Sequence, residues 1–72
     1  MASMNKLRGK IIENGMTVEQ LAEKIGIDRA TLYRKIAADG RTFTVKEADA
    51  IKRTLNLSVE EAFAIFFNHD VA

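Results

Sequence analysis

Residues 18–36 read VEQLAEKIGIDRATLYRKI, and this stretch decides the fold. Its order is an amphipathic run, a glycine, an apolar residue, a polar cap and a second amphipathic run. Leu21, Ala22 and Ile25 recur at helical spacing in the first run. Gly26 supplies the positive φ that redirects the chain through about 90–120° within three or four residues. The stretch therefore predicts two helices that meet across a tight turn, over about residues 17–37.

Both helices carry a start signal. Thr17 and Gln20 form a capping box, in which the Thr17 hydroxyl accepts from the Gln20 amide and the Gln20 side chain reaches back. Asp28 is an N-cap for the second helix. Leu32 and Ile36 are four residues apart and form its buried side. A helix-turn-helix follows from these signals alone.

Three further helices are predicted on either side of this pair. The first spans about Ser3 to Asn14, and Gly9 inside it suggests a close packing contact. Thr44 and Glu47 form the capping box of the fourth helix, and Ser58 and Glu61 form that of the fifth. The expected inward residues of the fourth helix are Val45, Ala48, Ile51 and Leu55. The apolar residues of the fifth are Ala62, Phe63, Phe66 and Phe67. No segment alternates long enough to predict a sheet, so the expected class is all-α.

Composition limits the function. The chain has 72 residues, 47% of them hydrophobic and 29% charged, which fits one globular domain over 1–72. It has no cysteine and one histidine, His69, so disulfides and thiolate metal sites are excluded and an enzyme is not expected. No apolar run approaches the length of a membrane span or a signal peptide. We interpret Met1-Ala2-Ser3 as an expression scar and expect a cytoplasmic protein.

The charges divide between the halves of the chain. Residues 1–36 hold seven basic and four acidic side chains, a net +3, and residues 37–72 hold four basic and six acidic ones, a net −2. The whole chain carries +1, too little to bind nucleic acid through bulk charge. A polyanion is therefore expected to meet the N-terminal half.

The sequence resembles the Xre-type helix-turn-helix proteins, which include the phage lambda-type repressors and Cro proteins. The resemblance covers about residues 4–68. It implies a compact five-helix, lambda-repressor-like DNA-binding domain. One departure is Lys35, which stands where the family often has an apolar residue. The matching residues are Gln20-Leu21-Ala22, Ile25-Gly26-Ile27, Thr31-Leu32-Tyr33-Arg34-Lys35, Phe43-Thr44, Ile51, Leu55-Asn56-Leu57-Ser58 and Phe66-Phe67.

By this resemblance, the third helix lies in the major groove of duplex DNA with its first residues at the base edges. The implied base contacts are Arg29, Ala30, Tyr33 and Arg34. The implied phosphate contacts are Thr17, Gln20, Lys35 and Arg41. Arginine suits guanine because its fork matches the O6 and N7 acceptors. No cofactor, metal, small-molecule ligand or membrane is implied.

The function expected from this resemblance is site-specific binding of double-stranded DNA by a small transcriptional regulator of phage or prophage type. The alternative is a protein-interaction module on the same fold, such as an antitoxin or an antirepressor partner. Arg29, Tyr33 and Arg34 on the outer side of the third helix favour DNA. A third interpretation is the DNA-binding half of a longer repressor.

The fifth helix is apolar almost all round, whereas packing on one side of a domain needs a stripe of about 100°. Ile65 is expected outside that stripe. We therefore expect a weak or DNA-induced homodimer with an interface at Ile65, Phe66 and Phe67. The alternative is that the first helix and the tail at Val71 cover both sides of the fifth helix.

Overall fold

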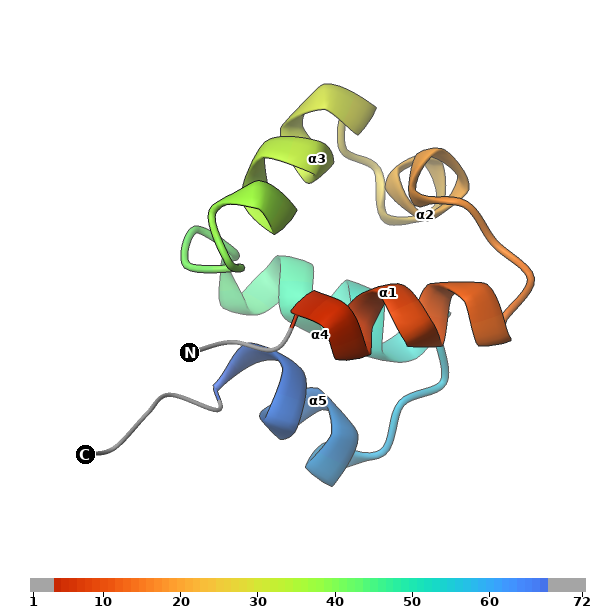
Figure 1. The fold of residues 1–72 in the computed structure, drawn as a ribbon, viewed down its shortest axis with the longest axis vertical. Helices are drawn as coiled ribbons and strands as arrows, with labels where there is room; N and C mark the ends of the chain where they lie inside the picture. Colours follow the sequence, from red (N-terminus) through yellow and green to blue (C-terminus); the bar gives the residue numbers. More distant parts are fainter. Residues whose placement is uncertain (1–3, 68–72) are drawn as a thin grey trace.

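Five helices make up the computed structural model, which describes residues 4–67 (Figure 1). No strand occurs among these residues, so the all-α prediction is confirmed. The interpretation of Met1-Ala2-Ser3 and the expectations for His69 and Val71 lie outside the described residues. The helices are α1 (Met4–Glu13), α2 (Val18–Ile25), α3 (Arg29–Ala37), α4 (Val45–Thr54) and α5 (Val59–Phe66).

The helix starts are fixed by the side chains that the sequence indicated. Thr17, Thr44 and Ser58 each begin a complete capping box, with both hydrogen bonds present. At α2, for example, the Gln20 amide donates to Thr17 Oγ1 at 3.1 Å and the Thr17 amide donates to Gln20 Oε1 at 2.9 Å. Each box satisfies two amide groups that a helix start otherwise leaves without a partner.

The turn between α2 and α3 has the geometry that the sequence predicted. Gly26 ends α2 with φ +78°, in the left-handed region. The Ile27 amide then donates back to the Ala22 carbonyl at 3.1 Å, which closes the turn. Because few L side chains adopt this φ, glycine is the residue that permits so short a connection.

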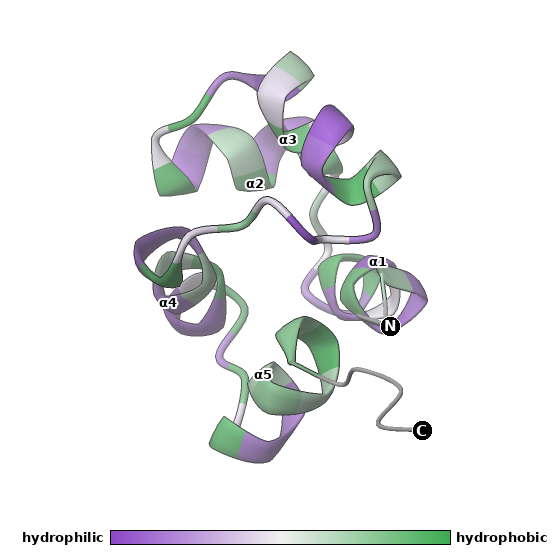
Figure 2. Ribbon diagram, turned by 90° about the vertical axis from the view of Figure 1, so that its left-hand side faces the viewer, coloured by the Kyte–Doolittle hydropathy of each residue, from purple (hydrophilic) through white to green (hydrophobic). Residues whose placement is uncertain are grey.

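The core forms where the apolar sides of all five helices meet. Figure 2 shows these hydrophobic faces turned toward one another, with α2 and α3 at one end of the molecule and α5 at the other. Helix α2 packs against α1, α3 and α4, and α5 packs against both α1 and α4. The buried apolar residues are Met4, Leu7, Ile11, Leu21, Ala22, Leu32, Ile36, Ala48, Ile51, Leu55, Leu57, Ile65 and Phe66.

The expectations for α5 need correction. Ile65 and Phe66 were both expected at a dimer interface. Ile65 is 1% exposed and Phe66 is 6% exposed, so neither side chain can contact a second molecule. The physical reason is that α5 lies between α1 and α4, so the stripe it buries is centred on Ala62, Ile65 and Phe66 and not on Phe63 and Phe67. Phe66 meets Phe43 edge to face, with ring centroids 5.3 Å apart. The contact of α5 with α1 is the alternative that the sequence had left open.

Other side chains expected inside lie on the surface instead. Val45 is 78% exposed and Phe63 is 62% exposed. Phe67, also exposed, stacks on Phe63 in a tilted pair with centroids 5.8 Å apart. The packing contact suggested for Gly9 is absent, because nothing lies within 4 Å of where its Cβ would be. These positions show where periodicity alone misjudged burial.

An ion pair joins the first and last helices at the surface. The Lys10 ammonium of α1 pairs with the Glu61 carboxylate of α5, and it also lies 3.5 Å from Glu13. The hydrogen bond from Lys10 lowers the pKa of Glu61 to about 2, and the capping hydrogen bond at Ser58 acts in the same direction. Within residues 4–67, none of the helices is both long and apolar enough to cross a membrane.

Candidate nucleic-acid interface

Helix α3 presents one side to the core and the opposite side to solvent. Leu32 and Ile36 are buried, whereas Arg29, Ala30 and Arg34 are exposed. Figure 1 shows α3 along the outer edge of the molecule, beside α2 and at the far end from α5. A duplex can therefore approach these three side chains without disturbing the core.

The start of α3 is held in place by its cap. Asp28 Oδ2 accepts from the Ala30 amide at 3.0 Å, which fixes the first turn that carries Arg29 and Ala30. Further along the helix, Arg34 Nη2 donates to Thr31 Oγ1 at 3.3 Å. This bond uses one corner of the Arg34 fork and leaves its other donors for an acceptor outside the protein.

The start of α2 offers donors next to α3. The capping box occupies Thr17 Oγ1 and Gln20 Oε1 as acceptors. The side-chain amide protons of Gln20 remain for an acceptor such as a phosphate oxygen, whereas the Thr17 hydroxyl also acts on Glu19, whose pKa it lowers. The first amide groups of α2 carry the positive end of the helix dipole, which favours an anion in the same place.

The hydroxyl of Tyr33 already has a hydrogen-bond partner within the protein. Its hydroxyl donates to the Glu19 carboxylate at 2.8 Å, although the ring is 43% exposed. This bond raises the pKa of Tyr33, and burial adds to the increase. The pKa of Glu19 is lowered, first by the hydrogen bond from its own backbone amide and then by Tyr33.

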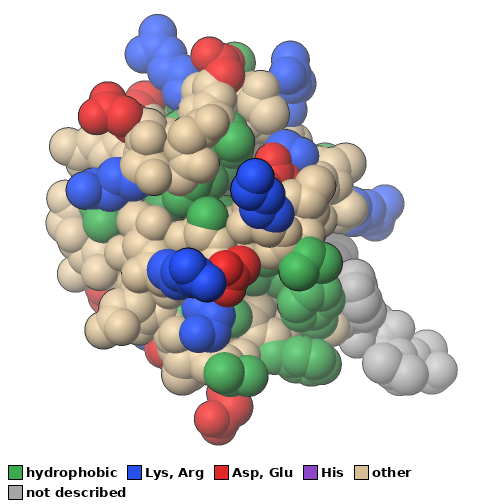
Figure 3. Space-filling view, turned by 180° about the vertical axis from the view of Figure 1, so that it is seen from behind, with side chains coloured by type: hydrophobic (Ala, Val, Ile, Leu, Met, Phe, Trp, Pro, Cys, Tyr) green, Lys and Arg blue, Asp and Glu red, His purple; other side chains and the backbone are tan. Residues whose placement is uncertain are grey.

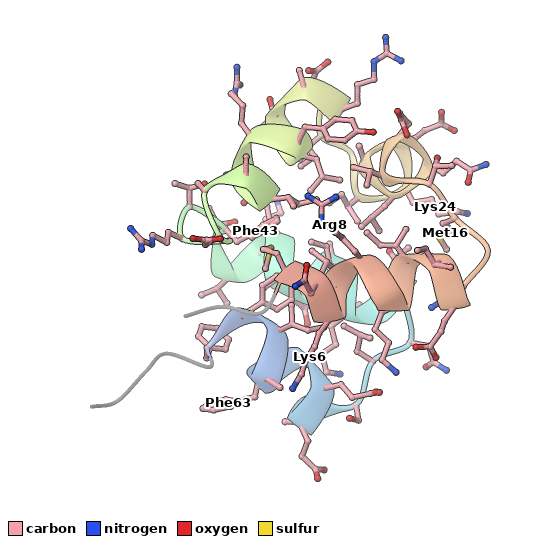
Figure 4. All side chains as sticks on the ribbon, viewed as in Figure 1. Lys6, Arg8, Met16, Lys24, Phe43 and Phe63 are labelled. Atoms are coloured by element: carbon pink, nitrogen blue, oxygen red, sulfur yellow. The ribbon has the colours of Figure 1, made fainter. Side chains whose placement is uncertain are left out.

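Two residues of this region were missed in the sequence. Neither Glu19 nor Arg8 was singled out as a candidate site residue. Figure 4 shows Arg8 projecting from α1 toward α2 and α3, where its charge acts on Tyr33. The sequence signal for Glu19 was its place in the first turn of α2, beside the helix that it crosses. No sequence pattern predicts that the Arg8 side chain extends toward α2 and α3.

Lys35, expected to contact a phosphate, has a different role. Its ammonium donates to the Thr42 carbonyl at 2.8 Å and lies 3.2 Å from Glu47 Oε1. It also lies over the Phe43 ring, 5.9 Å from the centroid, and its side chain is 15% exposed. The departure from the apolar pattern is thereby explained: the lysine stem covers the core while its charge is neutralised at the start of α4.

Glu47 completes this arrangement. Burial alone would raise the pKa of Glu47, but the hydrogen bonds from the Thr44 amide and from Lys35 outweigh it, so the pKa is lowered. One carboxylate thus caps α4 and binds the end of α3. Lys35 therefore stabilises the fold, and we do not retain it as a phosphate contact.

Arg41 lies in the turn between α3 and α4 and is exposed. The turn passes through Asp39 and Gly40, with φ of +59° and +74°. The structure thus places the expected contacts in two groups. Thr17 and Gln20 lie at the start of α2, where Glu19 contacts Tyr33 of α3. Arg41 lies beyond the C-terminal end of α3.

Comparison with known proteins agrees with this geometry. The family model of the Cro/C1-type HTH DNA-binding domain matches residues 6–67. No curated protein and no solved structure matches the chain. The matched range includes α2, α3 and the turn between them, together with nearly all of the other helices.

Proposed function

The chain belongs to the family of Cro/C1-type HTH DNA-binding domains, and from this premise we propose that it binds duplex DNA site-specifically and regulates transcription. The observation that carries the proposal is the exposed side of α3. Arg29, Ala30 and Arg34 stand there on a helix whose inner side is fully committed to the core. We propose base contacts for these three residues, with Tyr33 contributing its exposed ring.

Phosphate contacts are proposed for Thr17, Gln20 and Arg41. Such contacts set the position of the protein on the duplex and carry no sequence information themselves. We propose that the protein acts in the cytoplasm by occupying its site and excluding the transcription machinery. A phage or prophage origin is proposed on the resemblance to Cro and lambda-type repressors.

Selection of bound sites from random duplexes tests this function directly. We expect a defined site, and an affinity that falls steeply with salt because phosphate neutralisation releases counterions. Arg34→Ala is expected to cost about 1–3 kcal/mol and to relax preference at one base position per half-site. If the best selected duplex binds no better than random DNA at physiological salt, site-specific DNA binding is wrong. The alternative, a protein-interaction module, is then favoured.

We also propose a homodimer, through a surface that keeps Phe67 of the expected interface but not the buried Ile65 and Phe66. The α4–α5 patch consists of Val45, Val59, Phe63 and Phe67, which line one shallow groove with Asp49 and Lys52 at its border. Figure 3 shows apolar side chains gathered at the lower edge of the side that α4 faces, with charged side chains nearby. Figure 4 shows Phe63 directed away from the core.

A second copy suits this patch for two reasons. Asp49, which pairs with Arg53 of the same helix at 3.1 Å, and Lys52 carry opposite charges. Across a two-fold axis, Asp49 of each copy can therefore approach Lys52 of the other. The α5 part of the patch also lies at the end of the molecule away from α3, so pairing through α5 leaves both recognition helices accessible (Figure 1). Two copies read two half-sites, whereas a single α3 reads only a few base pairs.

Phe63→Glu tests the dimer. We expect this variant to keep its thermal stability, because Phe63 is largely exposed, and to lose cooperative binding to a palindromic site. Lys46→Glu, at an exposed position of α4 outside the groove lining, is the matched control. Cooperative binding by Phe63→Glu equal to that of the parent would place the interface elsewhere or remove it.

A further inference from the structure

The contact between Tyr33 and Glu19 connects the two helices of the proposed DNA interface at its surface. Tyr33 extends from the middle of α3, and Glu19 lies in the first turn of α2. Their hydrogen bond, at 2.8 Å, is a side-chain bond between the two helices, and both residues are exposed. The bond contributes little to burying the core, so its consequences concern what approaches this surface.

At neutral pH, Glu19 and Tyr33 have the protonation states that their hydrogen bond requires. The pKa of Glu19 is below its ordinary value and that of Tyr33 is above it, so the carboxylate is ionised and the phenol keeps its proton. The cations near Tyr33 are Arg29 on the same helix and Arg8 on α1. Both cations act to lower the pKa of Tyr33, but the hydrogen bond to Glu19 outweighs them. The hydrogen bond therefore directs the phenol proton at Glu19.

This arrangement restricts what Tyr33 can offer to DNA. An unbonded tyrosine hydroxyl can donate to any phosphate oxygen, and such a contact is the same for every sequence. Here the hydroxyl is occupied, and the carboxylate that occupies it stands at the start of α2 beside Thr17 and Gln20. A phosphate that approaches there meets a negative charge as well as the donors.

We propose that Glu19 is a specificity-determining residue of the DNA interface, because it holds the Tyr33 hydroxyl away from phosphates and fixes the ring for base contact. The inference rests on the proposed DNA-binding function. In a loosely held complex with random DNA, a released hydroxyl would find a phosphate and strengthen binding. In the specific complex, a ring held in advance loses less conformational freedom on binding. Both effects raise the ratio of specific to random affinity.

The test compares Glu19→Gln with the parent on the selected site and on a scrambled duplex, over a range of salt. We expect random DNA to bind more tightly and the ratio of affinities to fall roughly 3–10-fold, the size expected for one side chain's ordering. Glu23→Gln is the control, since it removes the same charge from an exposed position one turn further along α2. It is expected to leave the ratio within about twofold of the parent.

Tyr33→Phe separates the hydroxyl from the charge. If Glu19 acts through the hydroxyl, Glu19→Gln has a much smaller effect on the ratio in the Tyr33→Phe background than in the parent. A readout without DNA is also available, because Tyr33 is the single tyrosine and the chain has no tryptophan. Its ultraviolet ionisation curve is expected to shift to lower pH in Glu19→Gln and not in Glu23→Gln.

The outcomes are distinct. Suppose that the parent prefers its selected site. If Glu19→Gln leaves the ratio of specific to random affinity unchanged, or if Glu23→Gln changes it equally, this inference is wrong and the proposed function stands. An unchanged Tyr33 ionisation curve in Glu19→Gln overturns it as well, since the hydrogen bond would then be absent. A parent that prefers no site overturns the proposed function, and this inference with it.

Discussion

Replacing Lys35 with alanine is expected to lower the free energy of unfolding by about 2 kcal/mol. A hydrogen bond to a charged group contributes about 1.5–3 kcal/mol, whereas a fully exposed ion pair contributes about 0–1 kcal/mol. The side chains of Lys35 and Glu47 are 15% and 19% exposed, which places their pair between these limits. The variant also loses the lysine stem over Phe43 and leaves the Thr42 carbonyl without this donor.

Thermal unfolding followed by circular dichroism measures this loss. For a domain of this size, about 2 kcal/mol corresponds to a Tm lower by roughly 10 °C. Lys35→Met keeps an apolar stem of similar length, so it is expected to recover part of the loss. Lys24→Ala is the control, because Lys24 is exposed at the end of α2 and its removal is expected to cost under about 0.5 kcal/mol.

Acid should weaken the contribution of the Lys35–Glu47 ion pair to stability. The pKa of Glu47 is lower in the folded protein than its ordinary value of 4.5, so its contribution to stability is complete above that value. It is lost as the pH falls through the folded pKa. The difference in stability between the parent and Lys35→Ala should therefore narrow in acid.

Two results would refute the reasoning about Lys35. One is a Tm for Lys35→Ala within about 2 °C of the parent. The other is a fall of about 0.9 in the salt slope of DNA binding with unchanged stability, the signature of a lost phosphate contact. The second result would restore the role that the sequence had suggested.

Three further substitutions test other parts of the structure. Gly9→Ala should raise the free energy of unfolding by about 0.5–1 kcal/mol in urea denaturation, because a helical alanine meets nothing within 4 Å there; a loss of stability would contradict the open space. Glu61→Gln should flatten the fall in stability between pH 4.5 and about 2. Glu61 has a lowered pKa, so its contribution to stability is present above pH 4.5 and is lost toward pH 2. An unchanged acid profile would argue against its pair with Lys10. Ile65→Ala should cost about 2–5 kcal/mol because the side chain is buried, and a change below 1 kcal/mol or so would return Ile65 to the surface.

The sequence was sufficient for features that depend on neighbouring residues. Thr17 and Gln20 are three residues apart, and their reciprocal bonds need only the start of a helix. Gly26 is likewise recognisable because its φ is a local requirement of the turn. Helix existence and order followed from such signals, and the structure confirmed them.

The sequence was insufficient where burial depends on a distant element. Ile65 is buried because α1 and α4 both pack against α5, and helical periodicity carries no information about a second neighbour. Lys35 is polar by type, yet its burial is permitted by Thr42 in the following turn and by Glu47 in the next helix. The Tyr33–Glu19 bond depends on the crossing of α2 and α3, so it was visible only in three dimensions.

The separation of the two sides of α3 bears on how this protein could acquire a new target. Its start is fixed by Asp28 and its inner side by Leu32 and Ile36, none of which faces the duplex in the proposed complex. Arg29, Ala30 and Arg34 therefore contribute little to folding and are open to exchange. Variation at these positions, by evolution or in a designed library, can change the preferred site at small cost in stability. In the proposed complex, the residues that contact the bases can therefore be exchanged while the rest of the fold stays the same.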